Sequence, residues 1–240
     1  MILFFADMKD QNYKDKELGV VDVVVNPRAR RFIMRATADG IRVTVPPRST
    51  RQELDDVLHR NHDNLLRLRE KHKQQQPNIN FDYNIETDLI QLHLIRGSKP
   101  GFYLNRRLGS CEIVCPADTD FSTRQQWLSN VVTEQLRLQA KTILPERLKR
   151  LAAAHGFQYR RVCIQSSHTR WGSCSAGGSI NLSLYLMTLP SRLVDYVLLH
   201  ELCHTVHHDH SADFWALMDE VTDKKAHALR HELRKYHTGI

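Results

Sequence analysis

The sequence predicts an α+β protein, in which a β-rich N-terminal half with one long helix precedes a C-terminal half ordered helix, strand, strand, helix, helix. Two observations lead to this class. Short runs rich in Val or alternating in polarity dominate the first half, whereas apolar residues at helical spacing dominate the second. We therefore expect two subdomains, 1–120 and 121–240. The 240 residues are 41% hydrophobic, which is ample for a buried core.

The first elements are a strand and a β-hairpin. Residues 18–26 (LGVVDVVVN) form a Val-rich run that is typical of a strand. Residues 30–36 and 41–45 flank Asp39-Gly40, a dipeptide that favours tight hairpin turns. Thr50 and Glu53 then have the spacing of a capping box, which predicts a helix from there to about Gln75.

Alternation and breaker residues place the remaining elements. Two strands are expected over 88–95 and 110–115, joined by a turn-rich connection over 97–109. A helix is expected over 122–143, and a second short one from Pro145 to the helix stop Gly156. The expected later elements are strands over 161–166 and 180–186, a helix from Pro190 through Val206, and a last helix from Ser211 to about Tyr236.

The composition excludes several classes of protein. A charged fraction of 25% argues against a disordered chain, and no apolar run approaches the roughly 18 to 20 residues that cross a bilayer. The apolar start is followed at once by Asp7 and lacks a basic region, so we expect no signal peptide. Five cysteines form an odd set without the density of a disulfide framework, which favours reduced thiols and a cytoplasmic location.

Histidine is the unusual residue, because ten of the 14 histidines lie in the second half. Residues 200–204 read HELCH, and on a helix His200 and His204 present their imidazoles to one point. That spacing suits Zn²⁺, with ligand distances of about 2.0 to 2.1 Å. Glu201 would lie beside the ion and act as general base toward a water whose pKa the zinc lowers to about 7.

A catalytic zinc needs a third protein ligand, and spacing leaves two candidates. His207 is seven residues after His200 and shares its helical face. His210 follows His204 by six residues, as in HExxHxxGxxH proteases, although His207 stands where those enzymes have Gly. The motif itself predicts a metal-dependent hydrolase with a gluzincin- or metzincin-like site.

Several segments of the chain also resemble those of a known protein family. The chain is similar to the YgjP-like zinc metallopeptidases, which are related to the SprT-like and WLM proteases, over roughly residues 20–236. The segments that carry the resemblance are 170–175 (RWGSCS), 180–182 (INL), 195–197 (DYV), 200–204 (HELCH), 209–211 (DHS), 214–215 (FW), and in the first half the basic strand 28–35, Asp39-Gly40 and Pro46-Pro47. The resemblance implies a zincin-like C-terminal core, zinc held by His200, His204 and His210, Glu201 as catalytic base, and a protein or peptide substrate. Asp209, where the family usually has Asn, and His207 and His208 depart from its pattern.

Two further surfaces bear on substrates and partners. Arg170, Gly172 and Ser173 are candidate substrate-binding residues, because small residues permit close backbone approach and a strand edge beside a metal can align an extended peptide. Basic residues near Arg28 and Arg67 suggest a competing function, a nucleic-acid-associated protease, but interleaved acids and the lack of an aromatic stripe make it the minor hypothesis. A non-catalytic, metal-stabilised binding module is the third hypothesis.

Overall fold

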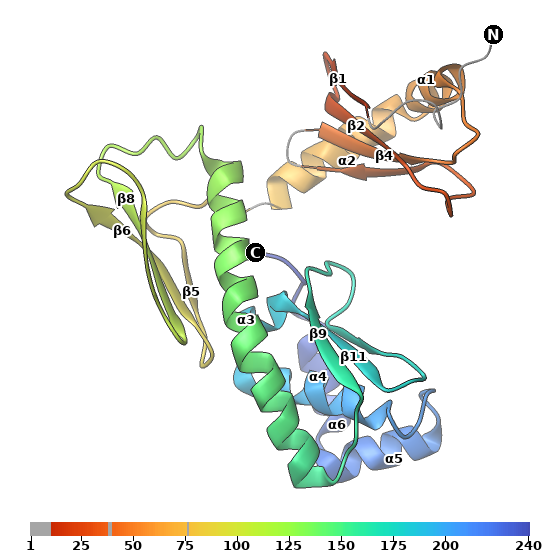
Figure 1. Ribbon diagram of the computed structural model, residues 1–240, viewed down its shortest axis with the longest axis vertical. Coiled ribbons are helices and arrows are strands. Elements are labelled where there is room, and N and C mark those ends of the chain that lie inside the picture. Colours follow the sequence, from red (N-terminus) through yellow and green to blue (C-terminus); the bar gives the residue numbers. More distant parts are fainter. Residues whose placement is uncertain (1–10, 38–39, 76) are drawn as a thin grey trace. The chain divides into compact units, whose positions relative to one another are not determined.

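The computed structural model describes residues 11–37, 40–75 and 77–240, in two compact units (Figure 1). The first unit ends at Pro77, and the second is Asn78–Ile240. The boundary expected at residue 120 therefore differs from the division that the contacts give. The strands between residues 84 and 116 share one hydrophobic core with the helices that follow, and sequence patterns do not report such packing. Asp39 of the expected hairpin turn and the apolar chain start lie outside the described residues.

The first unit contains a four-stranded mixed sheet. Its strands are β1 (Gln11–Asp15), β2 (Gly19–Val25), β3 (Ile33–Ala36) and β4 (Gly40–Val45), in the order β1-β2-β4-β3. The predicted strand and hairpin are confirmed, since β3 and β4 pair antiparallel. β4 also pairs with β2, in parallel. Apolar residues on one face of this sheet form the core of the unit with two helices.

The predicted capping box is confirmed. The Thr50 hydroxyl accepts a hydrogen bond from the Glu53 backbone N–H, and the Glu53 carboxylate accepts one from the Thr50 N–H. The helix that follows is interrupted, giving α1 (Arg51–Arg60) and α2 (His62–Gln75) where one helix was predicted. Asn61 lies at the break and donates a side-chain hydrogen bond to the Val57 carbonyl at 2.8 Å. Local side-chain bonding of this kind competes with helix continuation.

The second unit begins with another four-stranded sheet. Its strands are β5 (Asn84–Glu86), β6 (Gln91–Gly97), β7 (Tyr103–Arg107) and β8 (Ser110–Pro116), in the order β5-β6-β8-β7. β6 and β8 match the predicted strands. The connection expected over 97–109 was wrong in part, because it contains β7. All five residues of β7 are exposed, so this strand has no apolar alternation for a sequence pattern to detect.

A single long helix, α3 (Gln125–His155), crosses the second unit (Figure 1). The break expected at Pro145 does not occur. A proline inside a helix costs roughly 3 kcal/mol, but the fully buried residues Leu136, Ala140, Leu144 and Leu148 continue one packed stripe across it. Burial of that stripe outweighs the local penalty. The predicted stop is confirmed, because Gly156 ends the helix in the left-handed conformation with φ 74°.

A three-stranded sheet follows α3. Its strands are β9 (Arg161–Gln165), β10 (Gly172–Cys174) and β11 (Ser179–Ser183), in the order β10-β11-β9. β11 is parallel to β9 and antiparallel to β10, which leaves β10 at an edge. The strand expected over 180–186 is shorter than predicted. The Ser183 hydroxyl accepts from the Tyr185 N–H and starts the 3₁₀ helix η2 (Leu184–Thr188), most of which is buried.

Three helices complete the unit: α4 (Ser191–Cys203), α5 (Ala212–Val221) and α6 (Ala226–Leu233). The last predicted helix is thus two, because Asp223 and Lys224 adopt positive φ values of 50° and 60° between them. The predicted cap is confirmed, since the Ser211 hydroxyl accepts from the Phe214 N–H. The α+β class is confirmed. No helix in the described part of the chain has the length and apolarity to cross a membrane.

Candidate metal centre

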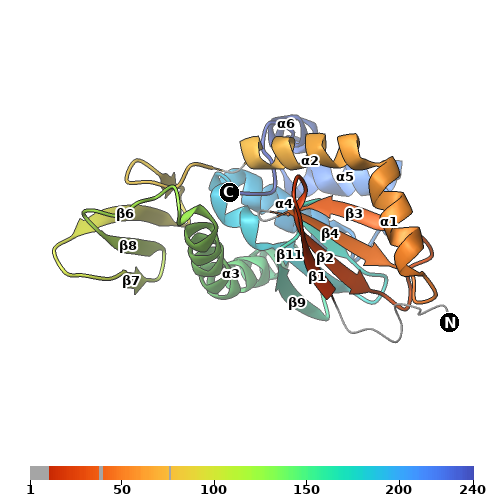
Figure 2. The same ribbon diagram turned by 90° about the horizontal axis from the view of Figure 1, so that it is seen from above.

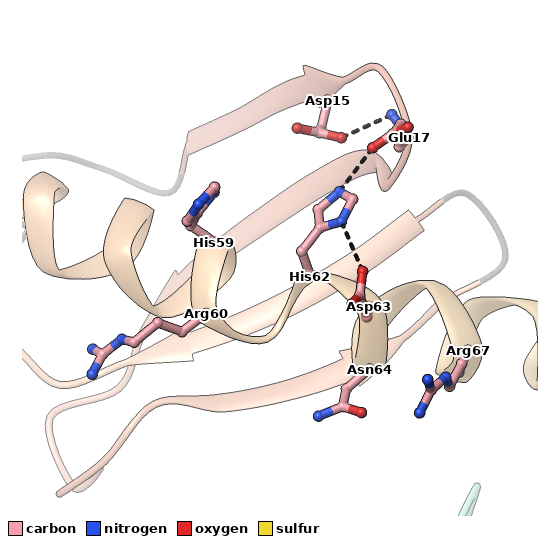
Figure 3. Close-up of a pocket in the computed structure, with 8 residues that line it drawn as sticks. All are labelled: Asp15, Glu17, His59, Arg60, His62, Asp63, Asn64 and Arg67. Atoms are coloured by element: carbon pink, nitrogen blue, oxygen red, sulfur yellow. Dashed lines mark hydrogen bonds and ion pairs between the residues drawn. The ribbon is translucent and has the colours of Figure 1, made fainter.

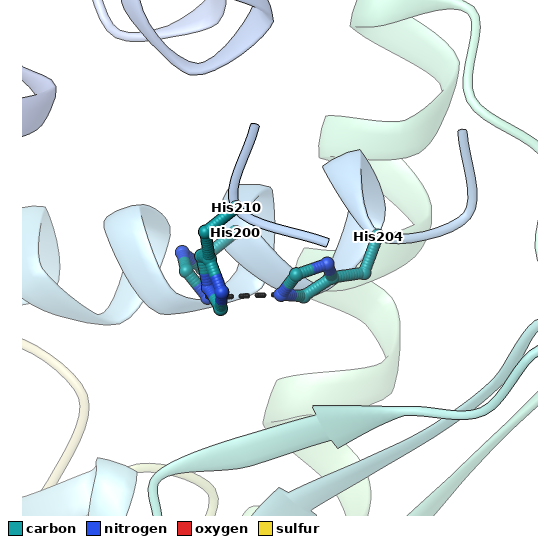
Figure 4. Close-up of side chains that lie close together, drawn as sticks. All are labelled: His200, His204 and His210. Carbon is teal, nitrogen blue, oxygen red and sulfur yellow. Dashed lines mark hydrogen bonds between the residues drawn. The ribbon is translucent and has the colours of Figure 1, made fainter. Parts of the chain in front are cut away.

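Helix α4 carries the first two histidines of the site. Nine of its residues are buried, among them Leu198, Leu199 and Leu202, so the helix is fixed in the core of the second unit. His200 lies in its last turn and His204 is its C-terminal cap. The one-turn spacing places the two imidazoles together, with 3.2 Å between their Nε2 atoms (Figure 4).

A tight turn after α4 brings the third histidine back to the first two. The His207 backbone N–H donates to the Cys203 carbonyl and so folds the chain over the end of the helix. Asp209 then accepts a hydrogen bond from the Ser211 N–H, just before α5 begins. His210 lies between these two features, and its Nε2 atom is 3.2 Å from Nε2 of His200.

These three histidines are the only group of potential ligands of this kind among the described residues, with ligand atoms all within 4.8 Å of one another. Two nitrogens bound to a tetrahedral zinc at about 2.0 to 2.1 Å lie roughly 3.3 to 3.4 Å apart. The two separations that involve His200, 3.2 Å each, match this value, and the ligand atoms of His204 and His210 lie within 4.8 Å of each other. The ring of His207 is not part of the group. Its backbone carbonyl instead lies 2.9 Å from Nδ1 of His204, a contact that leaves Nε2 of His204 free to bind a metal.

The electrostatics of the cluster favour the neutral imidazole at His200 and His210, the form that binds a metal. Burial and, to a smaller extent, the neighbouring His204 and His210 together lower the pKa of His200 to about 3. Burial also lowers the pKa of His210, although that side chain is more exposed. Nδ1 of His200 is buried with no hydrogen-bond partner among the described residues.

One phenylalanine supports all three rings. Phe214 of α5 is fully buried, and its ring centroid lies 5.0, 4.6 and 4.8 Å from those of His200, His204 and His210. Its contact with His204 is stacked, with an interplanar angle of 25°. Phe214 thereby orients the ligand set from beneath. Its contact with every histidine was not predicted from the sequence.

Glu201 lies on the side of α4 that faces the edge strand β10. Its side chain is 5% exposed, and its Oε2 atom is buried without a hydrogen-bond partner in the described chain. Burial raises the pKa of this carboxyl to about 8, against the opposing charge of Arg170. A buried carboxyl with a pKa this close to neutrality can accept and release a proton under ordinary conditions.

Gly172 makes room for this carboxyl. A Cβ atom at Gly172 would lie 2.6 Å from Oε1, 2.7 Å from Cγ and 2.9 Å from Cδ of Glu201. All three distances are shorter than real Cβ contacts, so any other residue here requires Glu201 or β10 to shift. Ser173, the next residue of β10, accepts a hydrogen bond from the Asn181 side chain at 3.4 Å. The structure thus places Gly172 against Glu201, and Ser173 one position farther along the same edge strand.

The comparison with protein families identifies a peptidase domain. The family model described as YgjP-like, metallopeptidase domain, matches residues 30–236. The chain belongs to the YgjP-like metallopeptidase family. Membership in this family makes the chain a metal-dependent peptidase, which confirms this part of the prediction from the sequence. No curated protein matches the chain. Among solved structures, the metallopeptidase zymogen abylysin of Pyrococcus abyssi is similar to 39% of this chain and 94% of its own, with 23% identity and a TM-score of 0.35.

A separate hollow lies entirely within the first unit. Its volume is about 730 Å³. Its lining residues are Asp15, Glu17, His59, Arg60, His62, Asp63, Asn64 and Arg67 (Figure 3). His62 contacts Glu17 at 3.1 Å and Asp63 at 3.8 Å. The sequence did not predict this hollow, because it arises where the β1–β2 turn meets the junction of α1 and α2.

Proposed function

We propose that this metallopeptidase uses zinc, held by Nε2 of His200, His204 and His210, with Glu201 as general base. The observation that best supports this proposal is the cluster of three imidazoles beside a buried carboxyl, one oxygen of which has no hydrogen-bond partner in the described chain. The order of elements in the second unit is α3, a small sheet, the motif helix α4 and the C-terminal helices. This order supports a zincin-like core. A zinc ion bound there would polarise the peptide carbonyl and lower the pKa of a water.

Glu201 would then move protons between the reactants. Its carboxylate takes a proton from the attacking water and passes it to the nitrogen of the leaving amine. The raised pKa, about 8, favours the protonated form that the second transfer requires. Oε2 has no hydrogen-bond partner within the described chain, so no existing hydrogen bond would have to break for a water or substrate group to bind this oxygen.

The edge strand β10 would align the substrate. Its antiparallel neighbour β11 occupies one side, so the other side offers free backbone groups to an extended peptide. Gly172 and Ser173 belong to this edge, and Arg170 precedes it. The positive charge of Arg170, which acts on Glu201, is suited to a substrate carbonyl or carboxylate oxygen.

Metal content and peptide cleavage, measured on the same preparations, test the proposal. We expect about one zinc per chain in the wild-type protein. Glu201→Gln should keep the zinc and lose cleavage by roughly 10²- to 10⁴-fold, the usual contribution of a general base. Zinc with no cleavage of any peptide by the wild type would instead indicate a metal-stabilised binding module.

The third ligand is tested by a matched pair of variants. His210→Ala should lose most of the zinc, because its ring nitrogen is removed from the cluster. His207→Ala should retain zinc, since His207 contributes its backbone carbonyl to His204 rather than its ring. Loss of zinc in His207→Ala with retention in His210→Ala would overturn the assignment.

A further inference from the structure

The arginines of the first unit are concentrated in one stretch of chain. From residue 28 to residue 48, the described residues include six arginines and no acid, and the sequence has a single acid there, Asp39. All six are exposed: Arg28, Arg30, Arg31, Arg35, Arg42 and Arg48. Five of the eight acids in the described part of this unit lie on α1 and α2, which pack on one face of its sheet: Glu53, Asp55, Asp56, Asp63 and Glu70.

The topology brings four of these arginines to one end of the sheet. β2 and β4 run parallel, so both finish at the same end, where the Asn26 N–H donates to the Val45 carbonyl at 3.1 Å. The loop after β2 carries Arg28, Arg30 and Arg31, and the loop after β4 carries Arg48. Helix α1 also begins here, where the Glu53 carboxylate of its capping box offsets the positive N-terminal end of the helix.

Helices α1 and α2 lie along one side of this sheet (Figure 2), and the other two arginines lie on its opposite face. Ile41 and Val43 point into the core with α1 and α2, so the alternation of β4 directs Arg42 to the other face. Arg35 is the direct antiparallel partner of Arg42. Like charges in such a pair are destabilising. Asp22 pairs with Arg42, but Arg35 has no acidic partner among the described residues.

We propose that this basic end and open face of the first unit bind the phosphate backbone of duplex nucleic acid. Arginine is the residue best suited to bidentate contact with phosphate, and every cation between residues 28 and 48 is arginine. A duplex presents its phosphates outward, so the surface needs no aromatic platform for stacking bases. A phosphate near Arg35 and Arg42 also relieves their mutual repulsion.

The opposite end of the same sheet is chemically different, which makes the proposed surface directional. The β1–β2 turn there contributes Asp15 and Glu17 to the hollow of Figure 3. Asp63 lines the same hollow. Arg60 and Arg67 also line this hollow, so this end presents mixed charge, whereas the loops at the other end carry Arg28, Arg30, Arg31 and Arg48 without an acid.

Fluorescence anisotropy of a labelled 30-base-pair duplex, titrated with the full chain at 50 and 200 mM salt, tests the proposal. Each phosphate contact changes Kd by about 3.5-fold over this salt range. For the wild type, the Kd at 200 mM salt exceeds the Kd at 50 mM salt by a certain ratio. In the triple variant Arg28→Ala, Arg30→Ala, Arg31→Ala, which removes three phosphate contacts, this ratio should be about 40-fold smaller. The control triple Arg106→Ala, Arg107→Ala, Arg150→Ala removes the same charge from exposed positions of the second unit and should bind as wild type does.

Two further measurements separate this proposal from its alternatives. Arg35→Gln should raise Tm, because it removes a like-charge pair, and should weaken duplex binding by about one phosphate contact. Glu201→Gln should bind the duplex normally, so a failure of the proposed catalytic mechanism leaves this inference intact. Equal weakening by both triple variants, no duplex binding at 50 mM salt, or tighter binding of polyglutamate than of duplex would each overturn the proposal.

Discussion

The contact between Gly172 and Glu201 yields a sharp prediction for Gly172→Ala. The added methyl carbon would lie 2.6 Å from Oε1 and 2.7 Å from Cγ of Glu201, where nonbonded contacts normally require about 3.5 Å. The carboxyl must therefore move by roughly 0.8 to 0.9 Å, or β10 must move away from α4. The first shift displaces the proposed base from the histidines, and the second displaces the proposed substrate-binding edge from the base.

The magnitude follows from the buried setting of the contact. Inserting a methyl group into a packed region costs about 1 to 3 kcal/mol of stability. Misplacing a reacting group by about 1 Å costs on the order of 10²-fold in rate, or about 2.7 kcal/mol of transition-state stabilisation. We therefore expect Gly172→Ala to retain zinc, cleave peptides about 100-fold more slowly, and unfold at lower urea concentration.

The assay combines peptide cleavage, zinc content and urea denaturation on matched variants. Gly177→Ala is the control, because a Cβ at Gly177 meets no atom within 4 Å. Its stability should stay within about 0.5 kcal/mol of wild type. Wild-type cleavage and stability in Gly172→Ala would refute the reasoning, and so would an equal loss in Gly177→Ala.

A double-mutant cycle in metal-depleted protein isolates the contact. In a Glu201→Ala background, the three atoms that clash with the new methyl group are gone. Gly172→Ala should then cost little, giving a coupling energy of about 1 to 3 kcal/mol between the two positions. Additive effects of the two substitutions would show that the strain lies elsewhere.

Three other substitutions test the packing, a turn and a cap. Phe214→Ala should destabilise the protein by about 3 to 5 kcal/mol and weaken zinc binding, because it removes a fully buried ring that contacts all three histidines; unchanged zinc affinity would contradict the orienting role. The backbone N–H groups of Leu18 and Glu17 hold the pKa of Asp15 below its usual value. The stability that Asp15 contributes is therefore present above the pKa of the unfolded state, near 3.9, and is lost as pH falls through the lower pKa of the folded state. Urea denaturation should show a lower stability for Asp15→Ala than for wild type at pH 7, and no such difference near pH 2. Thr50→Ala should cost about 1 kcal/mol through loss of the cap of α1, and an unchanged urea midpoint would argue against the capping box.

Local features of this protein were predictable because their causes lie within a few residues. The capping box at Thr50, the Ser211 cap and the Gly156 stop depend on backbone groups at most four residues away. The juxtaposition of His200 and His204 is equally local, because one turn of helix is enough to bring their rings together.

Other features depend on contacts between residues that are far apart in the sequence. The helix through Pro145 persists because the buried stripe of α3 packs against partners on both sides of the proline. β7 exists because β8 pairs with it, although its own residues are all exposed. The unit boundary near residue 77 likewise reflects which strands share a core with α3.

For the site, the sequence by itself determined the family resemblance, the HELCH helix and the short set of candidate third ligands. Only the tertiary structure decided which of them reaches the cluster, because the turn after Cys203 directs the carbonyl of His207 to His204 and the ring of His210 to His200. The same holds for Gly172 and Phe214, which contact the site from β10 and α5. Residue spacing fixes directions along one helix, whereas a metal site needs positions fixed by several elements packed together.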